Sequence, residues 1–182
     1  MPKVIENITE TILQTARNTL LSDGYDNLSL RMVAKQCNIA VGTIYNYFPS
    51  KLSLIVAIML EDWKEQTVKM RRACAHAESA EAGIKSIFLY LREFALIYQD
   101  VWVMSMHSKD VRVEMLNGRN RRQMLIEQLV GVIGVLLDRF EIPYDSFIPH
   151  FIATSLQTYI MEPDFDYEQL NKVFKKLLNG KK

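Results

Sequence analysis

Apolar residues recur at three- and four-residue steps along most of the chain, and this spacing predicts amphipathic helices. The predicted helices cover residues 5–21, 30–37, 41–48, 51–75, 82–98 and 101–107, a long segment that begins between 111 and 119 and ends at 140, and then 146–161 and 167–178. No segment shows the two-residue alternation that is typical of a half-buried strand. The pattern therefore predicts an all-α fold.

Capping and stop residues delimit several of these helices. Gly24 suits a left-handed stop after the first helix, and Ser29 suits the N-cap of the second. Pro49 ends the third helix and Ser50 caps the long fourth one, while Asp166 caps the last.

Two short helices, 30–37 and 41–48, flank a tight turn at 38–40 and follow a longer helix on which they can pack. This order predicts a helix-turn-helix, whose second helix enters the major groove of DNA. Ile44 and Phe48 are spaced to anchor the inner face of that helix. Their expected partners are Ile12, Ala16, Val33 and Ala34. The opposite face is then free to meet DNA.

Bulk charge does not indicate a nucleic-acid binder, because 22 basic and 21 acidic residues give a net charge of only +1. The DNA-binding hypothesis therefore depends on the local arrangement of residues. Cys37 and Cys74 are isolated, and no apolar run approaches the roughly 20 residues that a membrane span needs. We expect a cytoplasmic protein with no membrane partner.

The segment from Ile39 to Lys51, together with many positions before it, resembles the N-terminal pattern of the TetR/AcrR family of transcriptional regulators. The resemblance covers about the first third of the chain. The matching residues are Ile12, Leu13, Ala16, Leu20, Leu21, Gly24, Tyr25, Ser29, Val33, Ala34, Ile39, Gly42, Thr43, Ile44, Tyr45, Tyr47, Phe48, Ser50, Lys51 and Leu54.

The resemblance implies a role for each exposed residue of this region. Thr43 and Tyr45 are expected to face bases, and the Gly42 amide to approach the DNA. The residues expected at phosphates are Ser29, Asn46, Tyr47 and Lys51. Arg31, in the first turn of its helix, is a further phosphate candidate because of its charge and position.

The sequence departs from the family pattern at four positions. Asn38 stands where the turn usually begins with Gly, but Asn tolerates the left-handed conformation. Ala40 replaces the usual Ser cap, so one cap and one phosphate contact are lost. Val41 replaces a basic or polar residue and suits a thymine methyl, and Leu52 stands where an acidic residue is common.

We expect two domains, a DNA-binding helix-turn-helix domain at 1–50 and a helical effector-binding and dimerisation domain at 51–182. The long helix at 51–75 joins them. Apolar stripes on 146–161 and 167–178 predict a homodimer, although packing within one subunit explains the same stripes. The candidates for an effector pocket are Tyr90, Phe94, Trp102, Met106, His107, Arg122, Gln123 and Tyr159.

We predict no metal site, no cofactor and no catalytic residue. His107, Asp110 and Glu114 are loosely spaced, as at a solvated helix end, and no nucleophile–base pair or phosphate loop is found. The sequence instead predicts a ligand-responsive repressor that binds a pseudo-palindromic operator as a homodimer. The alternatives are an accessory regulator that binds DNA through a partner protein, and an enzyme.

Overall fold

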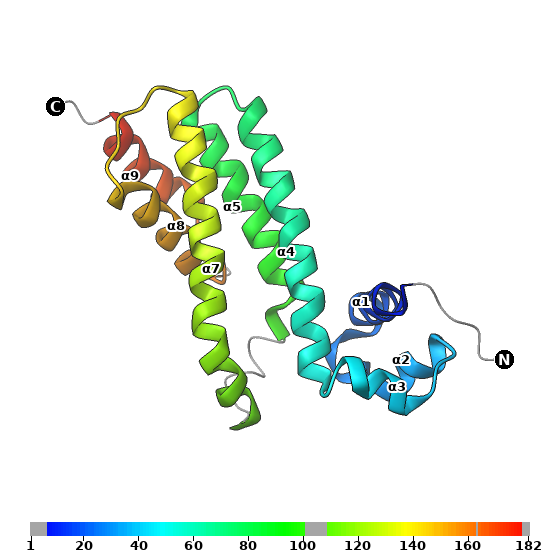
Figure 1. The fold of residues 1–182 in the computed structure, drawn as a ribbon. Coiled ribbons are helices and arrows are strands. Elements are labelled where there is room, and N and C mark those ends of the chain that lie inside the picture. The colour runs from blue at the N-terminus through cyan, green and yellow to red at the C-terminus, as the bar shows by residue number, and fades with distance from the viewer. Residues whose placement is uncertain (1–6, 101–108, 163, 180–182) are drawn as a thin grey trace. The chain divides into compact units, whose positions relative to one another are not determined.

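The computed structural model describes residues 7–100, 109–162 and 164–179, without the side chains of 109–122. Every regular element within these ranges is a helix, which confirms the all-α prediction (Figure 1). The helices are α1 (Ile8–Asn27), α2 (Leu30–Gln36), α3 (Val41–Tyr47), α4 (Lys51–His76), α5 (Ala80–Ile97), α7 (Lys109–Arg139), α8 (Phe147–Tyr159) and α9 (Tyr167–Asn179). The helix predicted at 101–107 lies outside the described residues.

The chain divides into two compact units, residues 1–62 and 63–182. The division falls inside α4, which runs without interruption from Lys51 to His76. The functional boundary that we predict between residues 50 and 51 coincides with the first residue of this helix, and it stays a prediction.

The first unit is built around a small apolar core. Ile12, Ala16, Val33, Ile44 and Leu54 are completely buried, and they come from α1, α2, α3 and the start of α4. Helix α2 packs against both α1 and α3. This core is what holds the short helices α2 and α3, since helices of seven residues are not stable alone.

The end of α1 differs from the prediction. Gly24 interrupts the helix with φ 79° and ψ 175°, which is an extended conformation of positive φ rather than the left-handed helical one. A further turn follows, so the element runs to Asn27. The Leu28 amide donates the last backbone hydrogen bond, to the Tyr25 carbonyl. Glycine still marks the break, because this region of φ and ψ is nearly closed to other residues.

In the second unit, the later part of α4 packs against α5 and α7. The Trp63 ring meets the Phe94 ring edge-on with centroids 5.3 Å apart, and Trp63 Nε1 donates to Gln128 Oε1 at 2.6 Å. Gly83 permits close contact between α5 and α7, because a Cβ there would lie 2.6 Å from the methyl carbons of Leu136. The predicted apolar face of α5 is confirmed as buried, namely Ile84, Ile87, Phe88, Leu91, Phe94, Ala95 and Tyr98.

Helix α7 begins earlier than predicted. It starts at Lys109 rather than between 111 and 119, and it continues through Gly118. A single glycine inside a helix costs only about 1 kcal/mol relative to alanine, so a helix as long as α7 can contain one. At the other end, Arg139 Nη1 donates to the Cys74 and Ala77 carbonyls at 3.0 and 2.7 Å, at the C-terminus of α4.

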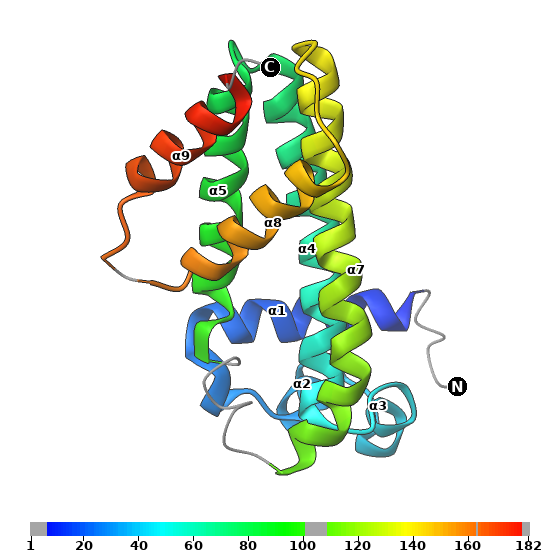
Figure 2. The ribbon, with the colours of Figure 1, turned by 90° about the vertical axis from the view of Figure 1, so that its left-hand side faces the viewer.

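Helices α8 and α9 complete the second unit, with α8 against α7 and α9 against α5 (Figure 2). Asp145 accepts the first amides of α8, those of Phe147 and Ile148, at 3.0 and 3.1 Å. The predicted Asp166 cap is confirmed, because its carboxylate accepts the Glu168 amide at 3.0 Å.

Candidate nucleic-acid interface

Helices α2 and α3 form the predicted helix-turn-helix, and its turn is held by backbone hydrogen bonds. The amides of Asn38 and Ile39 donate to the carbonyls of Lys35 and Ala34 at 3.1 and 3.0 Å. Asn38 has φ 54°, which is the left-handed conformation that its identity suggests. Replacing the customary glycine with asparagine therefore leaves the turn intact.

The inner face of α3 is anchored as the sequence indicates. Ile44 is completely buried and Phe48 is 7% exposed. Their predicted partners are buried as well, namely Ile12, Ala16, Val33 and Ala34. Because Ile44 and Phe48 lie one turn apart on the same side, burying them leaves the other side of the helix toward solvent.

The outer face of α3 exposes large side chains. Val41 is 40%, Tyr45 45% and Tyr47 46% exposed, and Asn46 and Gly42 are exposed too. Thr43 is half-buried. An exposed row of aromatic, amide and aliphatic groups offers hydrogen bonds and methyl contacts of the kinds that base edges and phosphates accept.

The first turn of α3 has no side-chain cap, as the alanine at position 40 implies. The Ala40 carbonyl accepts the amides of Thr43 and Ile44 at 2.9 and 3.4 Å. Gly42 has no Cβ, and no atom of the described residues, other than its chain neighbours and its own helix backbone, lies within 4 Å of where a Cβ would be. The backbone of this turn is therefore open to close approach from outside.

Ser29 and Arg31 lie at the start of α2 and are both exposed. The Ser29 hydroxyl oxygen accepts the Met32 amide at 3.2 Å, which confirms the predicted N-cap. This bond uses a lone pair of the oxygen, so the hydroxyl hydrogen can still be donated outward. Capping and a phosphate contact are thus compatible at this residue.

Lys51 is held more tightly than the sequence suggests. Its ammonium donates to the Tyr25 carbonyl and lies 3.9 Å from the centroid of the Tyr25 ring. Burial lowers the pKa of Lys51, and the charge of Asp26 acts in the opposite direction. Burial also raises the pKa of the Tyr25 hydroxyl, with Asp26 contributing.

Sequence reasoning assigned no role to Tyr25 beyond the family pattern. The Lys51 ammonium has three N–H donors, and the Tyr25 carbonyl takes only one of them. The Tyr25 carbonyl and ring fix the position from which the other donors point. No local spacing signals this pair, since 26 residues separate its members.

The described residues proposed for an effector pocket differ in their surroundings, and the pocket stays a prediction. Phe94 is buried against Trp63 and Tyr98, whereas Tyr159 is 38% exposed and stacks on Phe165 with centroids 4.3 Å apart. Tyr90 is half-buried and Gln123 is exposed. Trp102, Met106 and His107 lie outside the described residues, as does the side chain of Arg122.

Metal-ligating side chains are not clustered in the part of the chain that the structure describes. There, no three His, Cys, Asp or Glu side chains are grouped so that they could hold a metal ion. No single described helix is long and apolar enough to cross a membrane. Helices α3 and α4 reach that length and composition only as a pair bent by 58°.

Residues 12–58 match the family of bacterial regulatory proteins described as the tetR family. Over 76 residues the chain is 32% identical to the HTH-type transcriptional regulator UidR of Escherichia coli K12, an alignment that covers 42% of this chain and 39% of UidR. It is 40% identical over 50 residues to the HTH-type transcriptional repressor KstR of Mycolicibacterium smegmatis, covering 28% of this chain and 24% of KstR. The matched region thus spans about two-fifths of UidR and a quarter of KstR.

Solved structures resemble the chain over nearly its whole length. Salmonella enterica GusR matches with a TM-score of 0.60 at 21% identity, covering 96% of this chain and 98% of GusR. A TetR transcriptional regulator from Legionella pneumophila matches with a TM-score of 0.55 at 20% identity, again covering 96% and 98%. These similarities extend the shared fold beyond the sequence match.

Proposed function

Because this chain belongs to the TetR family of bacterial regulatory proteins, we propose that it is a ligand-responsive transcriptional repressor which binds a pseudo-palindromic operator as a homodimer. The observation that carries the proposal is the geometry of α3. Its inner face is anchored by Ile44 and Phe48, and its outer face exposes Tyr45 and its neighbours. A helix fixed on one side and free on the other is what major-groove reading requires.

The exposed residues divide by chemistry into reading and holding groups. Val41, Thr43 and Tyr45 read bases, because they lie on α3 and offer methyl, hydroxyl and aromatic groups. The Gly42 amide approaches the backbone. The phosphates are held by Ser29, Arg31, Asn46, Tyr47 and Lys51.

A pseudo-palindrome requires two DNA-binding heads, where the head is the first unit (residues 1–62) of each subunit. The last two helices are the proposed dimer interface. Phe147 on α8 is 66% exposed and Val173 on α9 is 49% exposed, so each helix keeps apolar surface that its own unit does not cover. Dimerisation through such surfaces places two identical heads about a twofold axis.

The proposed effector acts on the second unit, and α4 carries the response because it belongs to both units. An effector changes DNA affinity only if it binds one conformation of the protein better than the other. In this proposal the effector favours a conformation in which the two heads no longer match the operator spacing.

Selection from random duplex DNA tests the first part of the proposal. We expect the enriched sequences to contain an inverted repeat, and sedimentation velocity of the free protein to give a dimer at micromolar concentration. Compounds are then screened for release of the selected duplex. Failure to enrich any sequence by the purified protein, followed by enrichment once a cell extract is added, would favour an accessory regulator that needs a partner.

A further inference from the structure

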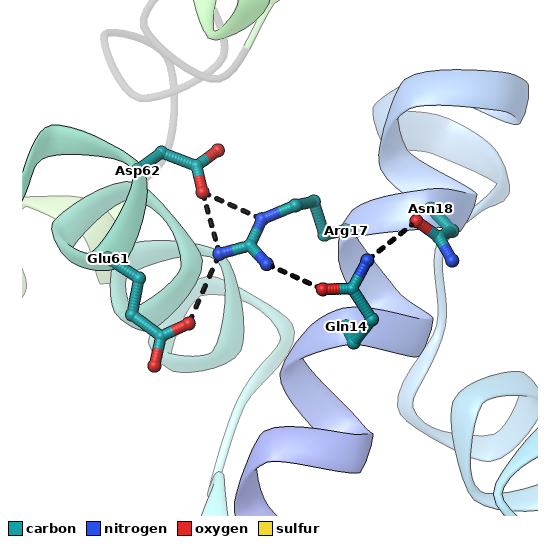
Figure 3. Close-up of polar contacts among 5 residues, drawn as sticks. All are labelled: Gln14, Arg17, Asn18, Glu61 and Asp62. Carbon is teal, nitrogen blue, oxygen red and sulfur yellow. Dashed lines mark hydrogen bonds and ion pairs between the residues drawn. The ribbon is translucent and has the colours of Figure 1, made fainter. Parts of the chain in front are cut away.

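Arg17 on α1 joins that helix to two consecutive acidic residues of α4 (Figure 3). Its Nε and Nη2 lie 2.7 and 2.6 Å from the same carboxylate oxygen of Asp62. Nη2 also lies 3.1 Å from Glu61 Oε2. One guanidinium therefore holds two carboxylates from neighbouring positions on a single helix.

Helix α1 fixes the orientation of this guanidinium from its other side. Arg17 Nη1 donates to Gln14 Oε1 at 3.0 Å, and Gln14 Nε2 in turn donates to Asn18 Oδ1 at 3.1 Å (Figure 3). A planar guanidinium that is bonded on three nitrogens has little freedom to rotate. The chain of bonds thus transmits the direction of α1 to residues 61 and 62.

The pair is sheltered from solvent, since the side chains of Arg17 and Asp62 are only 17% and 16% exposed. Burial alone lowers the pKa of Arg17, but the charges of Asp62 and Glu61 more than offset this effect. Salt screens a sheltered pair less than an exposed one. The contact is therefore stronger and more directional than an ordinary surface ion pair.

The Arg17 contact lies far from the first residue of α4, so it can affect the direction of the helix. Asp62 is the last residue of the first unit, and Lys51, eleven residues earlier, begins the helix. Eleven residues of α-helix span about 16 Å. The first turn is fixed by Ser50 and Ser53, whose amides and hydroxyls bond each other reciprocally at 3.0 Å.

A helix that is fixed only at its first turn can change direction, whereas a helix that is fixed at two separated points cannot. Leu54, Ile55 and Ile58 also bury α4 in the first unit, but apolar packing is not directional. The Arg17 contact supplies the directional second point, at the residue where α4 passes into the second unit.

We propose that Arg17 is a positioning residue that fixes the direction in which α4 leaves the DNA-binding head, and thereby the half-site spacing that a dimer accepts. This inference rests on the proposed function, because spacing has meaning only for a two-headed DNA reader. It gives Asp62 and Glu61 the same role from the α4 side.

The test uses duplexes that carry two copies of the selected half-site, with the spacer varied in steps of one base pair. Each step moves the half-sites apart by about 3.4 Å and rotates them by about a tenth of a turn. We expect the wild-type protein to prefer its best spacing over the neighbouring ones by about tenfold. Arg17→Gln should reduce this preference about fivefold, which is the lower end of the usual coupling between linked sites.

Asp62→Asn separates the positional effect from simple electrostatics. Arg17→Gln removes a positive charge and Asp62→Asn a negative one, so long-range attraction to DNA changes in opposite directions. Loss of the clamp predicts the same flattening of the spacing profile in both. Lys69→Gln, at an exposed position of α4, is the charge-matched control and should keep the wild-type profile.

The outcomes distinguish failure of the positioning role from failure of the proposed function. A flattened profile in both variants, with Lys69→Gln unchanged, supports the positioning role. An unchanged profile in Arg17→Gln, or affinity that falls equally at every spacing, overturns it and leaves the proposed function standing. If the wild-type protein binds no duplex, the proposed function itself is wrong. If Arg17→Gln does not fold, Arg17→Lys replaces it in the test. Lysine keeps the charge but lacks the planar set of guanidinium donors, so the spacing profile should flatten in the same way.

Discussion

Replacing Lys51 with alanine removes an ammonium that has two roles, one within the head and one at DNA. Within the head, the cation–π contact with Tyr25 at 3.9 Å and the bond to the Tyr25 carbonyl are both lost. Such contacts are worth about 0.5–2 and 0.5–1.5 kcal/mol respectively. Because Lys51 is only half-buried, we expect the free energy of unfolding to fall by about 1–2 kcal/mol.

At DNA, the loss is expected to appear in the salt dependence of binding. Each neutralised phosphate contributes about 0.9 to the slope of log affinity against log salt, so a dimer without Lys51 loses about 1.8. A fourfold rise in salt should then weaken the variant about 12-fold less than the wild type. This change should be the same on operator and on scrambled duplex, because a phosphate contact carries no sequence information.

Fluorescence anisotropy at four or five salt concentrations measures these slopes, and urea denaturation of the same samples confirms that the variant is folded. Lys51→Arg is the matched control, since it keeps the charge and should keep the slope. An unchanged slope in folded Lys51→Ala would refute the phosphate contact. The ammonium would then serve only to hold Tyr25.

Four other substitutions test separate parts of the structure. Tyr45→Ala should narrow the gap between specific and non-specific DNA by about 1–3 kcal/mol per half-site, with little change in the denaturation midpoint, because Tyr45 is 45% exposed. Phe48→Ala should lower the free energy of unfolding by about 3–5 kcal/mol in urea titrations, because that ring is 7% exposed; a loss near zero would mean that the faces of α3 are misassigned. Gly24→Ala should cost about 1–3 kcal/mol by the same measurement, since φ 79° with ψ 175° is nearly closed to alanine; a neutral result would argue against that backbone conformation. Glu81 has a lowered pKa, mainly because its own backbone amide bonds the carboxylate, so its stabilising effect is present above pH 4.5 and is lost as pH falls through the folded pKa. Glu81→Gln should therefore flatten the decline of thermal stability on acidification, and an unaltered acid profile would show that the carboxylate does not contribute.

The helix-turn-helix could be predicted from the sequence because its determinants are local. Ser29 caps a helix through an amide three residues away, and Asn38 sets a turn through its own φ. Ile44 and Phe48 share a face because they are one turn apart. Each of these signals lies within four residues, so a single sequence contains all of it.

The contacts that brace α4 could not be predicted in this way. Lys51 meets Tyr25 across 26 residues, and Arg17 meets Asp62 across 45. A helical pattern shows which face of a segment is buried, but it does not show which other segment covers that face. Arg17 simply reads as a cation on the polar side of an amphipathic helix.

The same limit applies to the second unit. Periodicity identifies the buried face of α5 correctly, including Phe94, but it does not identify Trp63 as the ring that Phe94 meets. The pocket candidate Tyr159 likewise stacks on Phe165, a partner that periodicity does not identify, and the pocket stays a prediction. Composition can nominate pocket residues, but only packing can bring them together.

Helix α4 thus carries the Lys51 contact, the Asp62 contact and the residues through which an effector is proposed to act. Their order along the helix matters for the proposed function. Lys51 lies at its first residue, where a phosphate contact is proposed, and Asp62 lies where the first unit ends. The remaining residues up to His76 belong to the second unit, where the effector is proposed to act. Because the helix is continuous, a change in its direction alters the positions of the residues at both of its ends. Thermodynamic linkage then makes the coupling reciprocal: an effector that favours a direction of α4 unsuited to the operator lowers the affinity for the operator, and the operator lowers the affinity for that effector by the same factor. Weakening the Arg17 contact should therefore reduce both effects together, since each depends on the direction that this contact gives to α4 at residues 61 and 62.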